Sequence, residues 1–179
     1  TTFRVYNDPQ MLYKNKTVVS MGRLVEGKGF DVLIRAFAQI SHEIPGWKLE
    51  IYGDGPEEGA LQVLIDALGM KDIIHLKGTT DRPQEVLSSS SFFVLASEAE
   101  GLPMSLIEAQ SCGLPCISTD CAPGIREIIK EYENGLIAPV GDVDVLARHI
   151  RRLAKNQELF VSYSRNAYVH SEKFDQKHI

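Results

Sequence analysis

The chain has 179 residues, of which 44% are hydrophobic and 24% charged, a composition typical of a single soluble globular domain. Its formal charge of -5 argues against a protein that mainly binds nucleic acid, since such proteins carry a basic stripe, whereas a small phosphate ligand needs only a few local cations. No apolar run reaches the length of about 18 residues that a membrane span requires.

The ends of the chain suggest a piece of a longer protein, because the sequence starts without Met and stops abruptly at "KFDQKHI". Residues 1–10 have neither the basic start nor the apolar core of a signal peptide. We expect residues 1–16 to form an interdomain linker, residues 17–156 the organised domain, and residues 157–179 a C-terminal helical segment.

Six apolar segments, each ending in small or polar residues, are typical of buried strands in a parallel sheet. In chain order they are "KTVVSMG", "WKLEIYG", "DIIHLKG", "SFFVLAS", "LPCIST" and "GLIAPV". Helical patterns lie between them, and two further helices are predicted over residues 143–155 and 157–170. This alternation predicts a three-layer, Rossmann-like α/β fold with a mostly parallel six-stranded sheet. Ligands of such sheets bind at the loops beyond the carboxyl ends of the strands.

The first of these loops, in "MGRLVEGKGFDVLI", offers two cations and several glycines. Glycines such as Gly22 let the backbone curl around a ligand, and Arg23 and Lys28 lie over the end of the strand. This arrangement is a reasonable clamp for a diphosphate, but a glycine-rich connector with two solvent-facing cations fits the loop equally well. The spacing is not that of a Walker loop.

The second loop, in "EIYGDGPEEGALQVL", superficially resembles a dinucleotide-binding fingerprint, because glycines follow a strand and open a helix. However, Glu57 and Glu58 fall in the first helical turn, where their charge would repel a pyrophosphate. We therefore interpret this loop as structural, and a nicotinamide oxidoreductase is disfavoured.

The segment "EAEGLPMSLIEAQSCGLP" places Glu100 and Glu108 eight positions apart. One continuous helix would bring both carboxylates toward one face, but Gly101 and Pro103 argue against such a helix. We predict a helix that begins near Pro103. Glu100 then lies in the preceding loop, and Glu108 lies between one and two turns inside the helix.

The backbone N–H groups of Leu102, Met104 and Ser105 are then expected to lie free between the two carboxylates. A helix start can hold a phosphate, while a carboxylate on each side accepts hydrogen bonds from hydroxyl groups. A nucleoside diphosphate sugar has this order of groups. The alternative is that one glutamate is a surface acid and the other a solvated helix residue, and spacing alone is weak support for a site.

The three cysteines, at positions 112, 116 and 121, cannot all pair with one another. No His lies at metal-finger spacing from them, so we expect buried free thiols rather than a metal site. The five histidines show no spacing that predicts a catalytic base.

Taken together, these segments resemble the C-terminal, donor-binding domain of the group 1, or family four, glycosyltransferases, which are retaining enzymes of GT-B architecture. The similarity runs in order across nearly the whole chain, through "GRLVEGKG", "IYGDGP", "IIHLKG", "SEAEGLPMSLIEAQSCGLP", "NGLIAPVGDVDVLA" and "SEKFDQKHI". The most specific part is the E-x7-E segment followed by G-x-P. One small departure is Gln110, where many relatives carry an apolar or small residue.

The resemblance implies roles for individual residues. Arg23 and Lys28 would hold the donor diphosphate and, with Glu100 on the transferred sugar, form the catalytic set. Glu108 would bind the ribose hydroxyls. Further donor contacts are implied for Gly22, for the backbone amides of Leu102, Met104 and Ser105, and for Lys77 at the start of the loop to Asp81, near the base.

The resemblance also implies an enzyme that transfers a hexosyl group, with retention, from a UDP- or GDP-sugar without an obligatory cofactor or metal. The acceptor, which is a glycan, a lipid-linked group or another hydroxyl, would be bound by an absent N-terminal domain. The fragment alone should therefore bind donor weakly and transfer little or nothing. We expect no nucleic-acid partner and a cytoplasmic location, with peripheral association at the inner membrane face through the absent domain as an option.

Two alternatives stay open. A nucleotide-sugar epimerase of GT-B-like fold would use a similar cleft, but the sequence offers no convincing acid/base pair for it. A non-catalytic nucleotide-sugar binding module would need the same donor contacts and no acceptor. Assays of the full-length chain for sugar release and acceptor modification would separate the two from a transferase.

Overall fold

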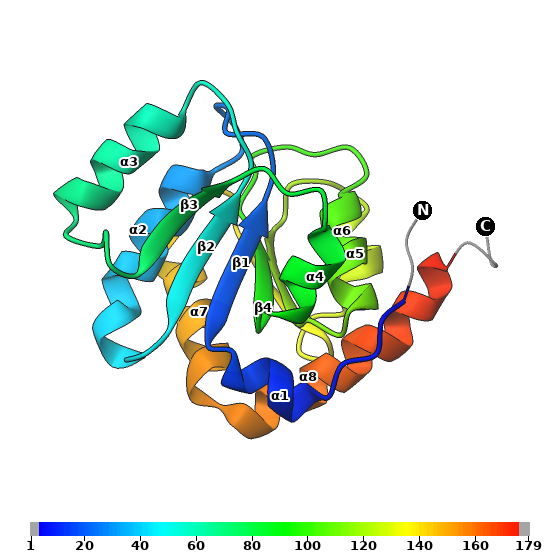
Figure 1. Cartoon of the computed structure of the whole chain (residues 1–179). Coiled ribbons are helices and arrows are strands. Elements are labelled where there is room, and N and C mark those ends of the chain that lie inside the picture. The colour runs from blue at the N-terminus through cyan, green and yellow to red at the C-terminus, as the bar shows by residue number, and fades with distance from the viewer. Residues whose placement is uncertain (1–3, 176–179) are drawn as a thin grey trace.

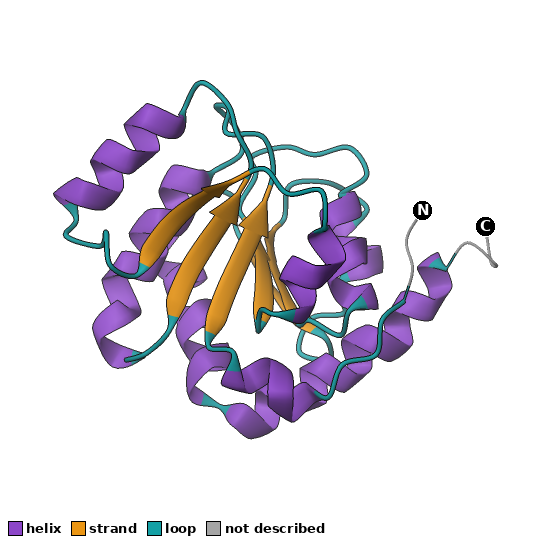
Figure 2. Cartoon of the chain, in the orientation of Figure 1, coloured by secondary structure: helices purple, strands orange, loops and turns teal. Residues whose placement is uncertain are grey.

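The computed structural model of the chain describes residues 4–175, which form an α/β sandwich around one parallel sheet (Figures 1 and 2). The sheet has six strands in the order β3-β2-β1-β4-β5-β6, and every described pairing is parallel. The strands are β1 (Thr17–Met21), β2 (Lys48–Tyr52), β3 (Ile74–Gly78), β4 (Phe92–Leu95), β5 (Cys116–Thr119) and β6 (Gly135–Ala138). They coincide with the six predicted segments, so the predicted fold class is confirmed.

Helices cover both faces of this sheet (Figure 1). One layer contains α2 (Phe30–Ile40), α3 (Glu58–Ala67) and α7 (Val143–Lys155), with α2 packed against both of the others. The opposite layer contains α1 (Pro9–Lys14), α4 (Pro83–Ser88), α5 (Met104–Ser111), α6 (Ile125–Ile128) and α8 (Gln157–His170). Short 3-10 turns follow α2 and α8, at Ser41–Glu43 and Ser171–Phe174.

Burial explains why the central strands are continuous apolar runs. All four residues of β4 are buried, and so are all four residues of β5 and β6, because helices cover these strands on both faces. By contrast, β2 alternates, with Leu49 and Ile51 buried and Lys48 exposed. Figure 1 shows no helix in front of β2 and β3, which accounts for the polar side chains on that face.

The helices at the end of the chain match their predicted limits, since α7 and α8 span residues 143–155 and 157–170. Asp142 caps α7 by accepting a hydrogen bond from the Val145 amide at 3.0 Å, as a side-chain N-cap should. Helix α1 lies within the segment expected to be a linker. The short helices α4 and α6 were not predicted, because four to six residues are too few to show a helical period.

Two of the three cysteines agree with the expectation of buried free thiols. Cys112 and Cys116 are buried and unpaired, whereas Cys121 is unpaired but only half-buried. Cys121 differs because it lies in the loop after β5 rather than in the core.

Candidate functional site

The candidate site lies where the strand order reverses. In the sheet β1 has β2 on one side and β4 on the other, and the chain leaves β1 for α2 on one face and β4 for α5 on the opposite face. The loops after β1 and β4 therefore diverge and leave a crevice at the carboxyl ends of the strands, which is the usual ligand position in open α/β sheets. The loops predicted to bind the donor are these two.

The loop after β1 contacts the end of β4 through a glycine. Gly29, the N-cap residue directly before α2, has a left-handed φ of 68°, and a Cβ added there would lie 1.8 Å from the carbonyl oxygen of Ala96. Only glycine fits both conditions. This contact holds the Lys28 side chain beside the β4 loop, while Arg23 is exposed and forms no ion pair or side-chain hydrogen bond with a described residue.

Glu100 is the centre of a hydrogen-bonded group. Its Oε1 lies 2.8 Å from Lys28 Nζ and accepts a hydrogen bond from Ser97 Oγ at 2.7 Å. Its backbone amide donates to the Cys121 carbonyl at 3.2 Å, and Thr119 Oγ1 donates to the Ser97 carbonyl at 2.6 Å. The loops after β1, β4 and β5 are thereby tied together around one carboxylate, whose side chain is only 16% exposed.

Ser97 and Thr119 were not predicted as site residues. A signal for both is present in the sequence, because Thr119 is a small polar residue that ends β5 and Ser97 is one that lies two residues after β4. Lys28 and Glu100 were predicted to contact different parts of a ligand, and a contact between them in the free protein was not expected.

The helix that follows Glu100 starts as predicted, with α5 beginning at Met104 directly after Pro103. The prediction that three amides are free is right for two of them. Within residues 4–175, the amides of Leu102 and Ser105 have no acceptor, but the Met104 amide donates to the Leu102 carbonyl at 2.9 Å. The tight turn before the helix accounts for this bond. Leu102 and Met104 are largely exposed, so the helix start is open to solvent.

Glu108 lies one turn inside α5 and is half-buried. Burial raises the pKa of its carboxyl group above the usual range. Its carboxylate makes no hydrogen bond or ion pair with any residue in the described part of the chain. A partly desolvated carboxylate of this kind is ready to accept hydrogen bonds from ligand hydroxyls.

Lys77 is placed differently from the other predicted site residues. It lies within β3 rather than beyond it, and its Nζ is 3.6 Å from Glu50 Oε2 on the neighbouring strand β2. Lys48 Nζ lies 3.7 Å from the same oxygen. The contact of Lys77 with a ligand thus stays a prediction that no described contact supports.

The loop after β2, which contains Gly53, packs against the loop after β1. A Cβ added at Gly53 would lie 1.8 Å from the Gly22 carbonyl oxygen, so the two turns touch backbone to backbone. The Leu24 amide donates to the Asp54 carbonyl at 2.7 Å, and the Glu57 amide donates to the Leu24 carbonyl at 2.9 Å. Glycine is therefore needed at position 53 for this packing. This agrees with the interpretation of the loop after β2 as structural.

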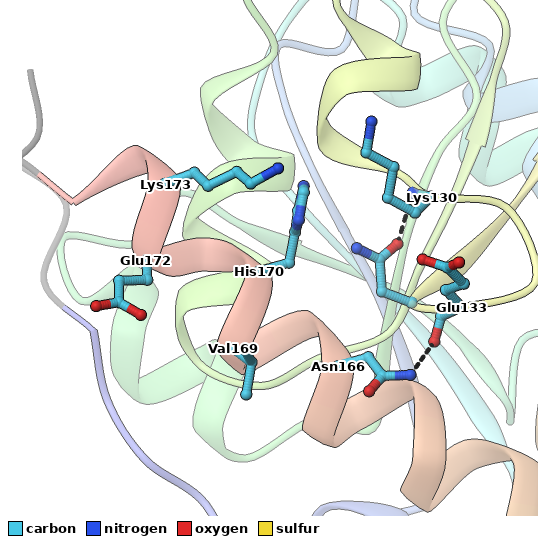
Figure 3. A pocket seen from close by; sticks show the side chains of 8 residues that line it. Lys130, Glu133, Asn166, Val169, His170, Glu172 and Lys173 are labelled. Atoms are coloured by element: carbon cyan, nitrogen blue, oxygen red, sulfur yellow. Dashed lines mark hydrogen bonds between the residues drawn. The ribbon is translucent and has the colours of Figure 1, made fainter.

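A cavity of about 870 Å³ lies elsewhere, between the turn before β6 and α8 (Figure 3). Several polar groups there are already satisfied by the protein. His170 Nε2 is hydrogen-bonded to the Glu127 carbonyl at 2.9 Å, and Asn166 Nδ2 donates to the Glu133 carbonyl at 2.7 Å. The size of this cavity therefore gives no reason to place the site there.

Across residues 4–175, no three His, Cys, Asp or Glu side chains lie close enough together to hold a metal ion. No helix in the same range has both the length and the apolar composition needed to cross a membrane.

Comparison with known proteins identifies relatives of the whole domain. The family model described as glycosyl transferases group 1 matches residues 8–170. An uncharacterized glycosyltransferase of Haemophilus influenzae is 33% identical over 161 residues, which are 90% of this chain and 46% of the relative. An N-acetylgalactosaminyltransferase of Campylobacter jejuni that acts on a diphospho-undecaprenol-linked sugar is 30% identical over 91% of this chain and 44% of its own length. The chain thus spans less than half the length of these curated relatives.

Solved structures agree with these matches. S. aureus TarM, crystallised with UDP and alpha-GlcNAc-glycerol, has a TM-score of 0.90 and 25% identity over 98% of this chain and 36% of TarM. The C-terminal domain of the group 1 glycosyl transferase LpcC from Francisella tularensis has a TM-score of 0.82 and 20% identity. That match covers 99% of this chain and 96% of the LpcC domain, so the two units have nearly the same extent.

Proposed function

Because the chain belongs to the group 1 glycosyl transferases and has the fold of a GT-B C-terminal domain, we propose that it is the donor-binding half of a nucleotide-sugar-dependent glycosyltransferase. The observation that carries this proposal is the contact between Lys28 and Glu100, in the loop that leads to the free amides of Leu102 and Ser105 at the start of α5. It places a cation, a carboxylate and a helix start at one crevice. A ligand that carries hydroxyls on either side of a diphosphate is complementary to these groups.

In the proposed complex, Arg23 and Lys28 contact the diphosphate, together with the amides of Leu102 and Ser105. Glu100 accepts hydrogen bonds from hydroxyls of the transferred sugar, and Glu108 accepts them from the ribose. Because Gly22 has no side chain, it leaves room for the ligand at the end of β1. The nucleotide is UDP or GDP, and UDP is the first to test because the TarM complex contains UDP.

The proposed reaction breaks the bond between the anomeric carbon and the phosphate oxygen and joins that carbon to an acceptor oxygen, whose proton is released. Negative charge grows on the departing nucleoside diphosphate while the sugar gains oxocarbenium character. Cations and amide dipoles already aimed at the diphosphate stabilise this charge without reorganising, and such preorganised electrostatics is usually the largest catalytic contribution. Residues that neutralise the leaving group in this way do not require a metal.

The family favours transfer over the epimerase alternative. A hydroxyl acceptor bound by an N-terminal domain, the domain limits at residues 16 and 156, a cytoplasmic location and peripheral membrane association stay predictions. The inactivity of the isolated fragment is also a prediction, since the acceptor's part of the site would come from another domain.

The proposal is tested by calorimetric titration of UDP, GDP and their hexose conjugates into the chain, with Arg23→Ala and Glu108→Ala as variants. We expect saturable binding that both substitutions weaken. Unchanged binding in both variants would contradict the site. A non-catalytic binding module is distinguished by assaying the full-length protein, because a module would bind donor without releasing sugar or modifying an acceptor.

A further inference from the structure

A second surface, here called the basic groove, runs along the outer side of α7 next to the edge strand β6. It encloses about 730 Å³, and its lining includes five basic residues of α7 and one aromatic residue from the turn before β6, namely Arg148, His149, Arg151, Arg152, Lys155 and Tyr132. The groove is separate from the loops after β1 and β4, whose residues do not line it.

The charge of this groove is only partly balanced by acids. In the described part of the chain, only Arg151 of its four cations forms an ion pair, with Glu43 at 3.4 Å. Arg148, Arg152 and Lys155 are exposed and have no such partner. Glu131, an acid on the turn before β6, acts through its charge on His149 in the groove, and its Oε2 accepts a hydrogen bond from the Ile137 amide at 3.2 Å. This local excess of positive charge contrasts with the overall charge of -5.

Like charges at this spacing repel each other. Arg148 and Arg152 are four residues apart on one helix face, and so are Arg151 and Lys155, an arrangement that destabilises a helix. The helix dipole favours the cations of the last turn, and Asp144, four residues before Arg148, favours that cation, but neither separates the paired cations from each other. A bound anion would remove the repulsion at every position.

The wall of the groove is shaped by Tyr132 and His149. Tyr132 has a left-handed φ of 64°, which is uncommon for a residue other than glycine, and the residue is 58% exposed. The Arg152 guanidinium lies 5.5 Å from the centroid of that ring. His149 Nε2 is hydrogen-bonded to the Ile137 carbonyl at 2.9 Å, and burial lowers the pKa of His149, so its ring adds no charge near neutral pH.

We propose that the basic groove binds a soluble ligand that carries two or more phosphate groups. Guanidinium groups match phosphate oxygens with paired hydrogen bonds, and the Tyr132 ring adds a face for stacking. From Arg148 to Lys155 the helix advances by about 10 Å, which is longer than one phosphate group. A membrane surface fits less well, because Tyr132 is the one large exposed apolar residue lining the groove among residues 4–175, and membrane-binding surfaces present several.

The test is an NMR titration of this chain with inorganic tripolyphosphate, which locates each binding event on the sequence. We expect amide shifts at Tyr132 and along residues 145–156, besides any shifts at residues 22–28 and 100–105 that belong to the donor site. The double variant Arg148→Ala/Arg152→Ala should weaken binding in the groove by about tenfold or more, because each substitution removes hydrogen bonds to a charged group. Binding should also weaken steeply with added salt.

The matched control is Lys71→Ala/Arg165→Ala, which removes the same charge from two exposed residues outside the groove. It should leave the groove affinity within about twofold of the original. An equal loss in both variants, or shifts at the donor loops alone, would overturn the proposal. So would binding to phosphatidylglycerol vesicles with no binding of tripolyphosphate, since the surface would then be a lipid site. If the arginine variant fails to fold, Lys155→Ala takes its place.

Discussion

Lys28 Nζ lies 2.8 Å from Glu100 Oε1, so an ion pair joins two residues that are 72 positions apart in the sequence. Lys28 comes from the loop after β1 and Glu100 from the loop after β4, the two strands that flank the switch point of the sheet. The cation proposed to meet the donor diphosphate is therefore already paired, in the free protein, with the carboxylate proposed to meet the sugar. Recognition of the two parts of the donor should then be coupled.

This coupling predicts opposite effects of Glu100→Gln on two ligands. Gln keeps the shape of the side chain and can still accept from Ser97, but it no longer competes with a diphosphate for Lys28. UDP should bind about two- to fivefold more tightly. The affinity for a UDP-sugar should fall about tenfold relative to the affinity for UDP, because the hydrogen bonds of sugar hydroxyls to a charged group are weakened. Calorimetry with both ligands measures the ratio, and a parallel change for both would refute the coupling.

Arg23 offers a cleaner probe of phosphate binding, because it is exposed and has no described ion pair to break. Arg23→Ala should weaken UDP binding by about tenfold or more, since hydrogen bonds to charged groups contribute about 1.5–3 kcal/mol. The melting temperature should stay the same. The matched variant Arg165→Ala, on α8, should change neither quantity. A shift in melting temperature with unchanged affinity would mean that Arg23 is structural.

The strands and the break between Glu100 and Glu108 were predictable because they depend on local chemistry. Runs such as Phe92–Leu95 are apolar on both faces, and Pro103 cannot sit inside a helix without cost. Contacts between loops were not predictable, because they depend on where distant segments meet. The Lys28–Glu100 pair belongs to this second class. The pairing of Lys77 on β3 with Glu50 on β2 likewise depends on segments that are far apart in the sequence.

Substitutions at Gly29 and Gly59 test how the loop after β1 is held in place. Gly29→Ala would place a Cβ 1.8 Å from the Ala96 carbonyl oxygen at a left-handed φ, so it should lower the free energy of unfolding by about 2 kcal/mol or more. Gly59→Ala, in helix α3, meets no atom within 4 Å and should raise the free energy of unfolding by about 0.4–1 kcal/mol. Urea unfolding of both variants measures the difference. Equal effects would mean that the Gly29 contact does not hold the loop.

The cysteines predict an order of thiol labelling. Burial raises the pKa of Cys112 to about 11 and that of Cys116 well above its usual range, whereas Cys121 is half-buried with a smaller rise. At pH 8 a maleimide should therefore label Cys121 first, and the other two only after unfolding. Mass spectrometry of digested protein identifies the labelled site. Because the Cys121 carbonyl accepts a hydrogen bond from the Glu100 amide, bound donor should slow the labelling of Cys121. Early reaction of Cys116 would contradict the packing of β5.

The ionised Glu108 carboxylate should lower the stability of the folded chain while strengthening the binding of UDP. Burial raises its pKa in the folded chain, so stability falls as the pH rises from the ordinary value, where the unfolded chain ionises, to the raised value, and the full cost remains above it. Below the ordinary value there is no cost, because folded and unfolded chains are both protonated. Glu108→Gln should therefore raise the melting temperature by about 1–2 °C at pH 7.5, and this gain should vanish near pH 4. The same variant should weaken UDP binding by about tenfold, because a neutral amide is a poorer acceptor for ribose hydroxyls.

The matched control for this prediction is Glu133→Gln, because Glu133 is exposed and its side chain makes no described hydrogen bond. It should leave both the melting temperature and the affinity for UDP nearly unchanged at either pH. A gain in stability from Glu108→Gln without a loss of affinity would show that the carboxylate is buried for a reason other than binding. A loss of both would mean that the carboxylate is held by the protein itself, and the ribose contact would then have to be abandoned.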